Sequence, residues 1–274
     1  MTAVRIGAVS FLNTRPLVYG LQTNPEYILT LDKPSHLAEK LRLGEIDVGL
    51  IPIVEYLRGI GDRVVPGICI ASDGPVRTVK LYSRIHPEKL THVAVDGGSR
   101  SSVALLRIVL AERFGVTPDF HTHPADLRAM LQAHEAALLI GDPAFTDSGA
   151  PFIWDLGQAW KELTNLPFVY AVWVLRRGID AARVSEWLTQ AMWDGIANLE
   201  RIAHDAAGTA NLEIDSVHSY LRDSLCFALG AREMRGIETF QKLCLRYSIV
   251  QGARELALAG EAVVGVDEPV PGAE

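Results

Sequence analysis

Strand and helix patterns alternate over the first 52 residues, and this order constrains the fold more than any other feature of the chain. Short apolar runs at residues 4–9, 27–31 and 46–52 are typical of strands, and helical segments are expected after Pro16 and Ser35. The order strand, helix, strand, helix, strand is the signature of a parallel sheet with right-handed crossovers. The sequence therefore predicts an α/β fold.

A second unit with the same order begins near residue 91. Strand patterns at residues 92–95, 120–122 and 136–140 alternate with helical patterns at residues 103–114 and 124–134. Because 274 residues exceed the usual domain size of about 100–200, we expect two lobes. We place the first lobe at residues 1–86 and 176–274 and the second at residues 87–175.

Three further runs complete the expected sheets. Residues 64–71 and 76–83 have strand patterns and precede the second unit. The apolar run at residues 168–175 predicts a strand that is buried on both faces and returns between the lobes.

The pattern changes after residue 180. Residues 181–204, 209–229 and 231–249 have helical spacing and no strand signal, so they predict a helical wrap on the first lobe. The segment from Glu261 is rich in Pro, Gly and acidic residues and predicts a frayed end.

Charge and cysteine content exclude several classes of partner. The net charge of -7 leaves no broad basic surface for nucleic acid. The three cysteines are odd in number and far apart, which is typical of free thiols in a reducing compartment. The amino terminus has no signal-peptide pattern, and no apolar run approaches the roughly 20 residues that span a bilayer. We therefore expect a cytoplasmic protein without a membrane partner.

A polar turn follows the first strand. In an open α/β sheet, the backbone N–H groups of the helix after such a strand point into the crevice where anions bind. Ser10, Asn13 and Thr14 are expected to lie there, before Pro16. The alternative is that Asn13 or Thr14 only caps the following helix.

A glycine and hydroxyl loop occupies the corresponding position of the second unit. Gly97 and Gly98 precede Ser99, Ser101 and Ser102, so backbone N–H groups and hydroxyls meet at a helix start, which suits a carboxylate. The loop matches neither the Walker pattern nor G-x-G-x-x-G. The two loops together predict a cleft for a small anion with two carboxylates.

No metal, cofactor or covalent chemistry is indicated. His121 and His123 are two residues apart, but no third ligand follows the spacing of a zinc site. The chain also has no nucleophile elbow, no paired-carboxylate spacing and no Cys/His pair.

Six motifs resemble the chorismate dehydratase family of the futalosine route to menaquinone. They occur in order at residues 10–17, 44–52, 72–79, 98–102, 139–144 and 155–173. The resemblance implies a two-lobed fold of the type II periplasmic-binding-protein class. It also implies a cytoplasmic hydro-lyase that removes water from the dicarboxylate chorismate, without a cofactor, to give 3-[(1-carboxyvinyl)oxy]benzoate.

The resemblance also implies site residues. The family's active-site asparagine falls on Asn13, and its active-site hydroxyl falls on Thr78, where relatives have Ser. A loop expected to hold a carboxylate and a Gly-Asp motif facing the cleft supply the other expected substrate contacts. These are Ser99, Arg100, Ser101, Ser102 and Asp142, in addition to Ser10 of the first turn.

Two alternatives belong to other functional classes. A solute-binding module of the same fold would need an export signal or a lipid anchor, and neither pattern is present. Dihydroxynaphthoate synthase, a later enzyme of the same pathway, begins with a Ser-Pro-Cys-Pro-Asn-Asp-Thr-Phe stretch that residues 10–17 do not match. The oligomeric state is left open.

Overall fold

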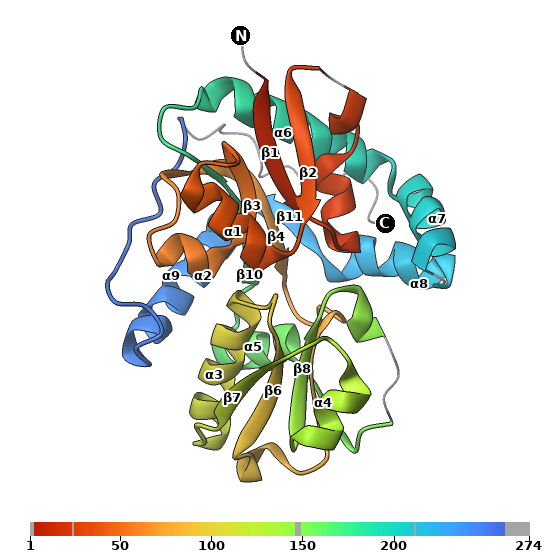
Figure 1. The fold of residues 1–274 in the computed structure, drawn as a ribbon, viewed down its shortest axis with the longest axis vertical. Coiled ribbons are helices and arrows are strands. Elements are labelled where there is room, and N and C mark those ends of the chain that lie inside the picture. The colour runs from red at the N-terminus through yellow and green to blue at the C-terminus, as the bar shows by residue number, and fades with distance from the viewer. Residues whose placement is uncertain (1–2, 24, 146–148, 211, 261–274) are drawn as a thin grey trace.

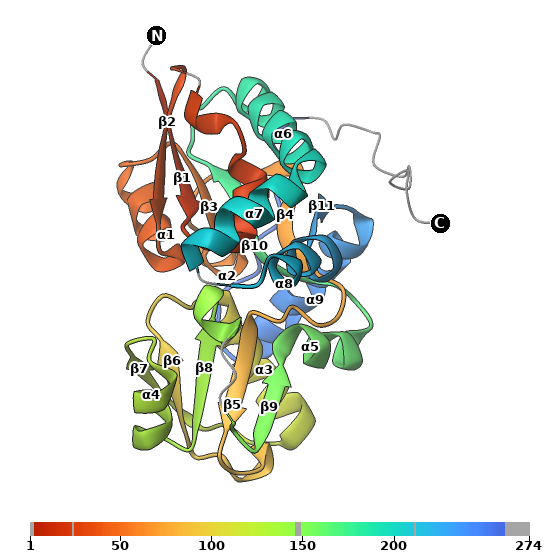
Figure 2. The same ribbon diagram turned by 90° about the vertical axis from the view of Figure 1, so that its right-hand side faces the viewer.

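The computed structural model describes residues 3–23, 25–145, 149–210 and 212–260. The chain forms two lobes, one above the other in Figures 1 and 2, and each lobe is built on its own mixed sheet. The α/β class and the two lobes are as predicted. The expected frayed segment from Glu261 lies outside the described residues.

The first lobe contains a six-stranded sheet with the order β11-β4-β10-β3-β1-β2. Strand β1 is parallel to β2 and β3, whereas β10 runs antiparallel between β3 and β4. Every residue of β10 is buried, which confirms the predicted doubly covered strand. The elements are β1 (Val4–Val9), β2 (Tyr27–Asp32), α1 (Pro34–Leu43), β3 (Val48–Pro52), α2 (Ile53–Leu57), β4 (Arg63–Ser72), β10 (Phe168–Leu175) and β11 (Cys226–Leu229).

The second lobe contains a five-stranded sheet with the order β7-β6-β8-β5-β9. Strand β6 is parallel to β7 and β8, and β5 is antiparallel to β8 and β9. The elements are β5 (Val79–Ser83), β6 (His92–Asp96), α3 (Ser101–Phe114), β7 (Asp119–His123), α4 (Leu127–Ala133), β8 (Ala136–Ile140), β9 (Phe152–Asp155) and α5 (Leu156–Thr164).

The sheets divide the chain differently from the predicted lobes. The expected limits assign β5 to the first lobe and β10 to the second, but β5 pairs with β8 and β10 pairs with β3. The chain therefore crosses between the lobes at residues 73–78 and 165–167. Strand pairing is non-local, so the apolar runs alone did not reveal this division.

The C-terminal region is not entirely helical. The prediction of a helix over residues 209–229 is wrong at its end, because β11 is a strand that pairs with β4 and lengthens the first sheet. Helices α6 and α7 cover the first lobe, and α8 lies at the boundary between the lobes (Figure 2). The helical elements are α6 (Ala181–Ala197), α7 (Leu199–Ala210), α8 (Ile214–Ser219), the π-helical turn η5 (Tyr220–Ser224) and α9 (Ala231–Arg246).

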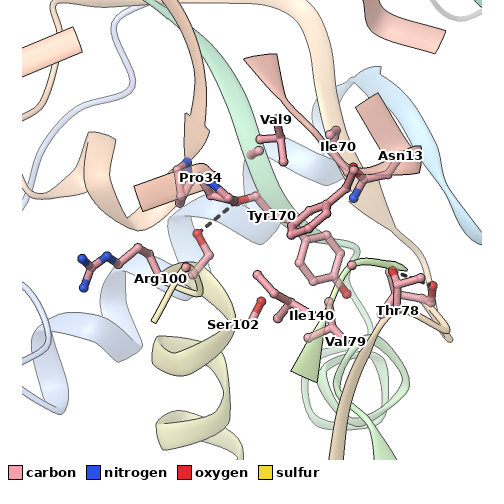
Figure 3. Close-up of a pocket in the computed structure, with 17 residues that line it drawn as sticks. Val9, Asn13, Pro34, Ile70, Thr78, Val79, Arg100, Ser102, Ile140 and Tyr170 are labelled. Carbon is pink, nitrogen blue, oxygen red and sulfur yellow. Dashed lines mark hydrogen bonds between the residues drawn. The ribbon is translucent and has the colours of Figure 1, made fainter. Parts of the chain in front are cut away.

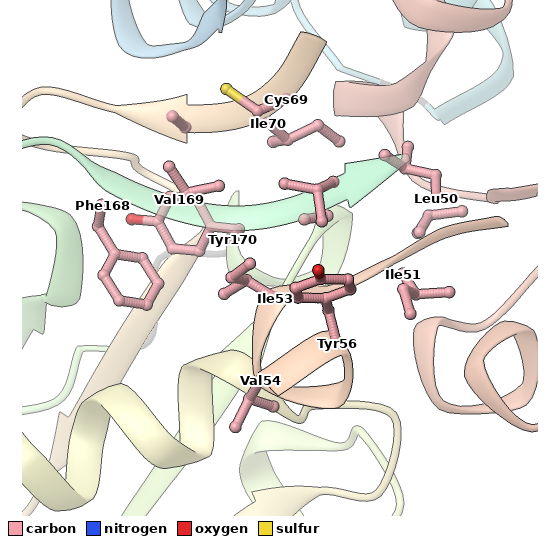
Figure 4. Packing of buried hydrophobic residues seen from close by; sticks show 14 of the residues in the cluster. Leu50, Ile51, Ile53, Val54, Tyr56, Cys69, Ile70, Phe168, Val169 and Tyr170 are labelled. Atoms are coloured by element: carbon pink, nitrogen blue, oxygen red, sulfur yellow. The ribbon is translucent and has the colours of Figure 1, made fainter. Parts of the chain in front are cut away.

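The core continues beneath the boundary between the lobes. Figure 4 shows Ile53 and Tyr56 of α2 beside Val169 and Tyr170 of β10, all of them members of one buried cluster. A fully buried side chain of this size stabilises the fold by about 1.5–3 kcal/mol relative to an exposed one. The strand β10 is thus held rigidly where it faces the other lobe.

The three cysteines are free, as the sequence predicts. Burial raises the pKa of the Cys69 thiol well above its ordinary value. None of the described helices is long and apolar enough to cross a membrane.

Candidate functional site

A cavity opens between the lobes. In Figure 3, Asn13 and Thr78 lie on one side of this cavity and Arg100 and Ser102 on the other. Its walls are mainly apolar, with few polar groups, which is the usual composition of a small-molecule site. Five of the predicted site residues, Ser101 among them, are thereby brought together.

Asn13 reaches the cavity from a 3₁₀ helix, η1 (Leu12–Val18), which follows β1. The helix was predicted to start at Pro16, but Pro16 lies inside it, and Phe11 precedes it without a side-chain cap. Asn13 is therefore not a helix cap, and neither is Thr14, whose hydroxyl donates to Asn13 Oδ1 at 3.3 Å. The capping alternative is wrong for both residues.

Thr78 is fully buried at the crossing between β4 and β5. The residue before it, Arg77, has a positive φ of 66°, a conformation that is unfavourable for a residue with a Cβ. Asp155 holds this turn, because its carboxylate accepts the N–H of Val76 at 3.0 Å and that of Arg77 at 2.6 Å. The same carboxylate accepts the Gln158 N–H at the start of α5. Thr78 is thus positioned by the second lobe.

The glycine loop contributes the start of α3. The Asp96 carboxylate accepts the Gly98 N–H at 3.0 Å and fixes the loop. Ser101 donates to the carbonyl of Tyr170 at 3.0 Å and accepts the N–H of Val54 at 3.4 Å, so its hydroxyl ties the two lobes together. The first turn of an α-helix has N–H groups without intrahelical acceptors. Ser102 is buried beside these groups and lines the cavity.

Arg100 provides positive charge. It is the one charged side chain that lines the cavity among the described residues. Its Nε is 3.9 Å from Glu55 Oε1, whereas Arg58 binds the same oxygen at 2.9 Å. Because Glu55 is already paired and the Arg100 side chain is 47% exposed, the guanidinium is available to an anion.

Three predicted site residues lie outside the cavity. Ser10 is exposed and borders a separate hollow beside η1 and α7. Ser99 is buried, and its hydroxyl has no hydrogen-bond partner within the described part of the chain. Asp142 accepts the Leu12 N–H at 3.1 Å, and burial raises the pKa of its carboxyl against the effect of that bond. Asp142 therefore joins the lobes rather than lining the cavity.

Close contact between the lobes explains why the first residue of the Gly-Asp motif is a glycine. Gly141 has a φ of +67°, and a Cβ at this position would lie 2.7 Å from the ring of Phe11. Any larger residue would push Phe11 away from β8, because Cβ atoms do not approach other heavy atoms so closely. Gly141 thus allows the first turn to close against the second lobe.

Two tyrosines were missed from the sequence. Tyr170 lines the cavity, and its hydroxyl is 3.1 Å from Ser72 Oγ. Tyr220 places its hydroxyl 2.9 Å from Thr78 Oγ1. Burial raises the pKa of Tyr220, and the side chains of Thr78 and Asn13 oppose that shift. Tyr170 stood in an apolar run and Tyr220 in a helical pattern, so neither had a local signal.

Metal binding has no structural support here. His121 lies near His92 and His134, with His92 Nδ1 3.2 Å from His121 Nε2. However, no group of three or more His, Cys, Asp or Glu side chains is arranged to hold a metal ion within the described ranges.

Comparisons with known proteins identify relatives. A sequence model described as menaquinone biosynthesis matches residues 4–246. Chorismate dehydratase of Thermus thermophilus is 29% identical over 224 residues, which are 74% of this chain and 81% of the relative. Chorismate dehydratase of Campylobacter jejuni is 25% identical over 237 residues, which are 85% and 90% of the two chains.

Solved structures share the fold. An Archaeoglobus fulgidus protein has a TM-score of 0.72 at 17% identity, covering 90% of this chain and 98% of that one. The periplasmic aliphatic sulphonate-binding protein SsuA of Escherichia coli has a TM-score of 0.66 at 20% identity, covering 99% and 97%. These likenesses confirm the predicted periplasmic-binding-protein-like fold.

Proposed function

The chain belongs to the menaquinone biosynthesis family, and from this premise we propose that it is a chorismate dehydratase. The observation that carries the proposal is the composition of the cavity. One side offers the neutral donors Asn13 and Thr78, and the other offers Arg100 and a helix amino terminus. This arrangement suits a small dianion that must be oriented as well as bound.

The reaction removes the ring hydroxyl of chorismate and a proton from the neighbouring ring carbon, giving 3-[(1-carboxyvinyl)oxy]benzoate and water. Because the product ring is aromatic, the equilibrium favours dehydration. The enzyme therefore needs mainly to orient the leaving hydroxyl and to stabilise developing charge.

We assign orientation of the substrate to Asn13 and Thr78. An amide and an aliphatic hydroxyl donate hydrogen bonds but do not act as bases at neutral pH. No carboxylate or imidazole lines the cavity among the described residues. We therefore propose that the enolpyruvyl carboxylate of the substrate accepts the ring proton.

We assign carboxylate binding to Arg100 and Ser102, with the first N–H groups of α3. A guanidinium binds a carboxylate through charge-assisted bonds, which are stronger than neutral ones. Ser101 supports this loop through Tyr170 and Val54. The proposal includes a cytoplasmic lyase that works without a resident cofactor.

Incubation of the purified chain with chorismate tests the proposal. Chromatography should detect 3-[(1-carboxyvinyl)oxy]benzoate without added metal or nucleotide, and an enzyme-free sample corrects for spontaneous decay of the substrate. Treatment with a chelator should leave turnover intact. Tight binding of unchanged chorismate would instead favour a solute-binding module, and turnover that requires metal would contradict the cofactor-free mechanism.

A further inference from the structure

We infer that Tyr220 is a positioning residue of this reaction, which holds the Thr78 hydroxyl in place at the boundary between the lobes. The inference rests on the proposed function. Tyr220 belongs to η5, in the C-terminal region, where the sequence shows no site pattern. It does not line the cavity, so it acts through Thr78, which does.

The contacts of the hydroxyl carry this inference. Tyr220 and Thr78 are both only 1% exposed, and their oxygens are 2.9 Å apart. One buried hydroxyl from a distant part of the chain thus contacts a residue assigned to orient the substrate.

The bonding capacity of these hydroxyls leaves a donor for the substrate, because each carries one hydrogen. The Thr78 hydroxyl has an acceptor for its own hydrogen, so Tyr220 is assigned as the donor to Thr78 Oγ1. The acceptor of the Thr78 hydrogen within the protein is the Val76 carbonyl at 3.4 Å, a long bond that a substrate oxygen can replace.

The strained turn before Thr78 also holds the helix that carries Tyr220. The guanidinium of Arg77 donates to Ser219 Oγ at 2.9 Å and to Ser216 Oγ at 3.0 Å. The ring of Tyr220 packs edge-on against Phe145, with centroids 5.0 Å apart. A closed ring of contacts therefore joins Thr78, Tyr220, Ser219 and Arg77. Such mutual support keeps orienting groups in place, and π-helical turns often occur at functional sites.

Tyr220→Phe removes only the hydroxyl. We expect kcat to fall by about 10- to 100-fold, because Thr78 loses the bond that orients its hydroxyl. KM should change by less than about threefold, since Arg100 and Ser102 remain in place.

Tyr56→Phe is the matched control. Tyr56 is also fully buried, and its hydroxyl is also hydrogen-bonded, donating to the Glu255 carbonyl at 3.1 Å and accepting the Ala257 N–H at 3.0 Å. Both variants should lose similar thermal stability, but Tyr56→Phe should keep its kcat. Equal loss of kcat in the two variants, or a Tyr220→Phe kcat within twofold of wild type, would overturn the inference.

A double-mutant cycle tests whether Tyr220 acts through Thr78. Thr78→Val removes the hydroxyl at nearly constant volume, and Thr78→Ser keeps it. Adding Tyr220→Phe to Thr78→Val should lower kcat little further, whereas adding it to Thr78→Ser should lower kcat as in wild type. Effects that multiply in the Thr78→Val background would contradict action through Thr78.

A readout without turnover separates this inference from the proposed function. Wild-type protein that leaves chorismate unchanged would refute the function. In that case the methyl resonance of Thr78 still reports the contact. It should shift in Tyr220→Phe and not in Tyr56→Phe, and an unshifted resonance would overturn the link.

Discussion

The two polar turns that face the cavity follow equivalent strands but present different chemistry. After β1 the chain forms the short 3₁₀ helix η1, which contributes a side-chain amide from inside the helix. After β6 it forms a glycine loop and the 14-residue helix α3, which contributes Arg100, Ser102 and helix N–H groups. The repeat in element order therefore does not carry over to the site.

This difference assigns orientation of the substrate to the first turn and affinity for the substrate to the second. An amide hydrogen bond is directional and weak, so it selects the position of one substrate atom. A guanidinium and a helix amino terminus attract any nearby carboxylate and contribute mainly to binding. Changes in the first turn should thus lower kcat, and changes in the second should raise KM.

The strongest test of this contrast is Asn13→Asp. The variant loses two N–H donors and adds a charge that repels a dianionic substrate, so turnover should fall by more than about 100-fold. The melting temperature should stay near that of wild type, because the residue is only half-buried. Turnover and melting are measured on the same preparation. Unchanged turnover would remove Asn13 from the site.

Arg100→Gln probes the second turn. We expect KM to rise about 10- to 100-fold, with kcat within about threefold of wild type, because a charge-assisted bond to the substrate is lost. Steady-state kinetics at two ionic strengths checks this, since added salt should raise KM less in the variant than in wild type. Arg177→Gln is the control, as its side chain is 90% exposed. A loss confined to kcat would break the proposed division of roles.

Ser102→Ala and Ser101→Ala distinguish a residue that contacts the substrate from one that stabilises the loop, within the same turn. Ser102→Ala should raise KM by about three- to tenfold with little change in melting, because its hydroxyl faces the cavity. Ser101→Ala should lower the melting temperature instead, because it breaks the bonds to Tyr170 and Val54. Kinetics and thermal melts of both variants provide the comparison, and the reverse pattern would exchange their roles.

The smallest effect is expected for Asp142→Asn, at the contact that joins the first turn to the second lobe. Burial raises the pKa of Asp142 in the folded state, so its ionised form destabilises the fold. The stability that the neutral Asp142 carboxyl contributes to the fold is fully present below the unfolded-state pKa. It is lost as pH rises through the folded-state pKa. The variant keeps an acceptor for the Leu12 N–H without the charge.

Thermal melts across pH check this prediction. The Asp142→Asn variant should melt slightly higher than wild type at neutral pH, and the difference should shrink as pH falls below the raised pKa. Lower stability of the variant at neutral pH would show that attraction to a cation such as Arg15 outweighs burial.

Local pattern predicted most elements, because helices and strands leave a periodic signal in the sequence. The strand predicted at residues 136–140 is β8 as observed, and the helix predicted at residues 103–114 is α3 without its first two residues. β11 was missed because four residues joining an existing sheet edge carry too short a pattern. The sheet that β5 and β10 each join also depends on pairing with strands far along the chain.

The site divides in the same way. A polar residue after a strand is visible in the sequence, and Asn13, Arg100 and Ser102 were found from such positions or from the motifs around them. Tyr220 and Thr78 are 142 residues apart, and only the packing of α8 against the crossing turn brings their hydroxyls together. The sequence alone indicated several of the polar groups that line the cavity, Asn13, Arg100 and Ser102 among them. Tertiary structure decided how they are oriented, because a hydrogen bond between distant residues depends on the folded positions of both and leaves no local pattern.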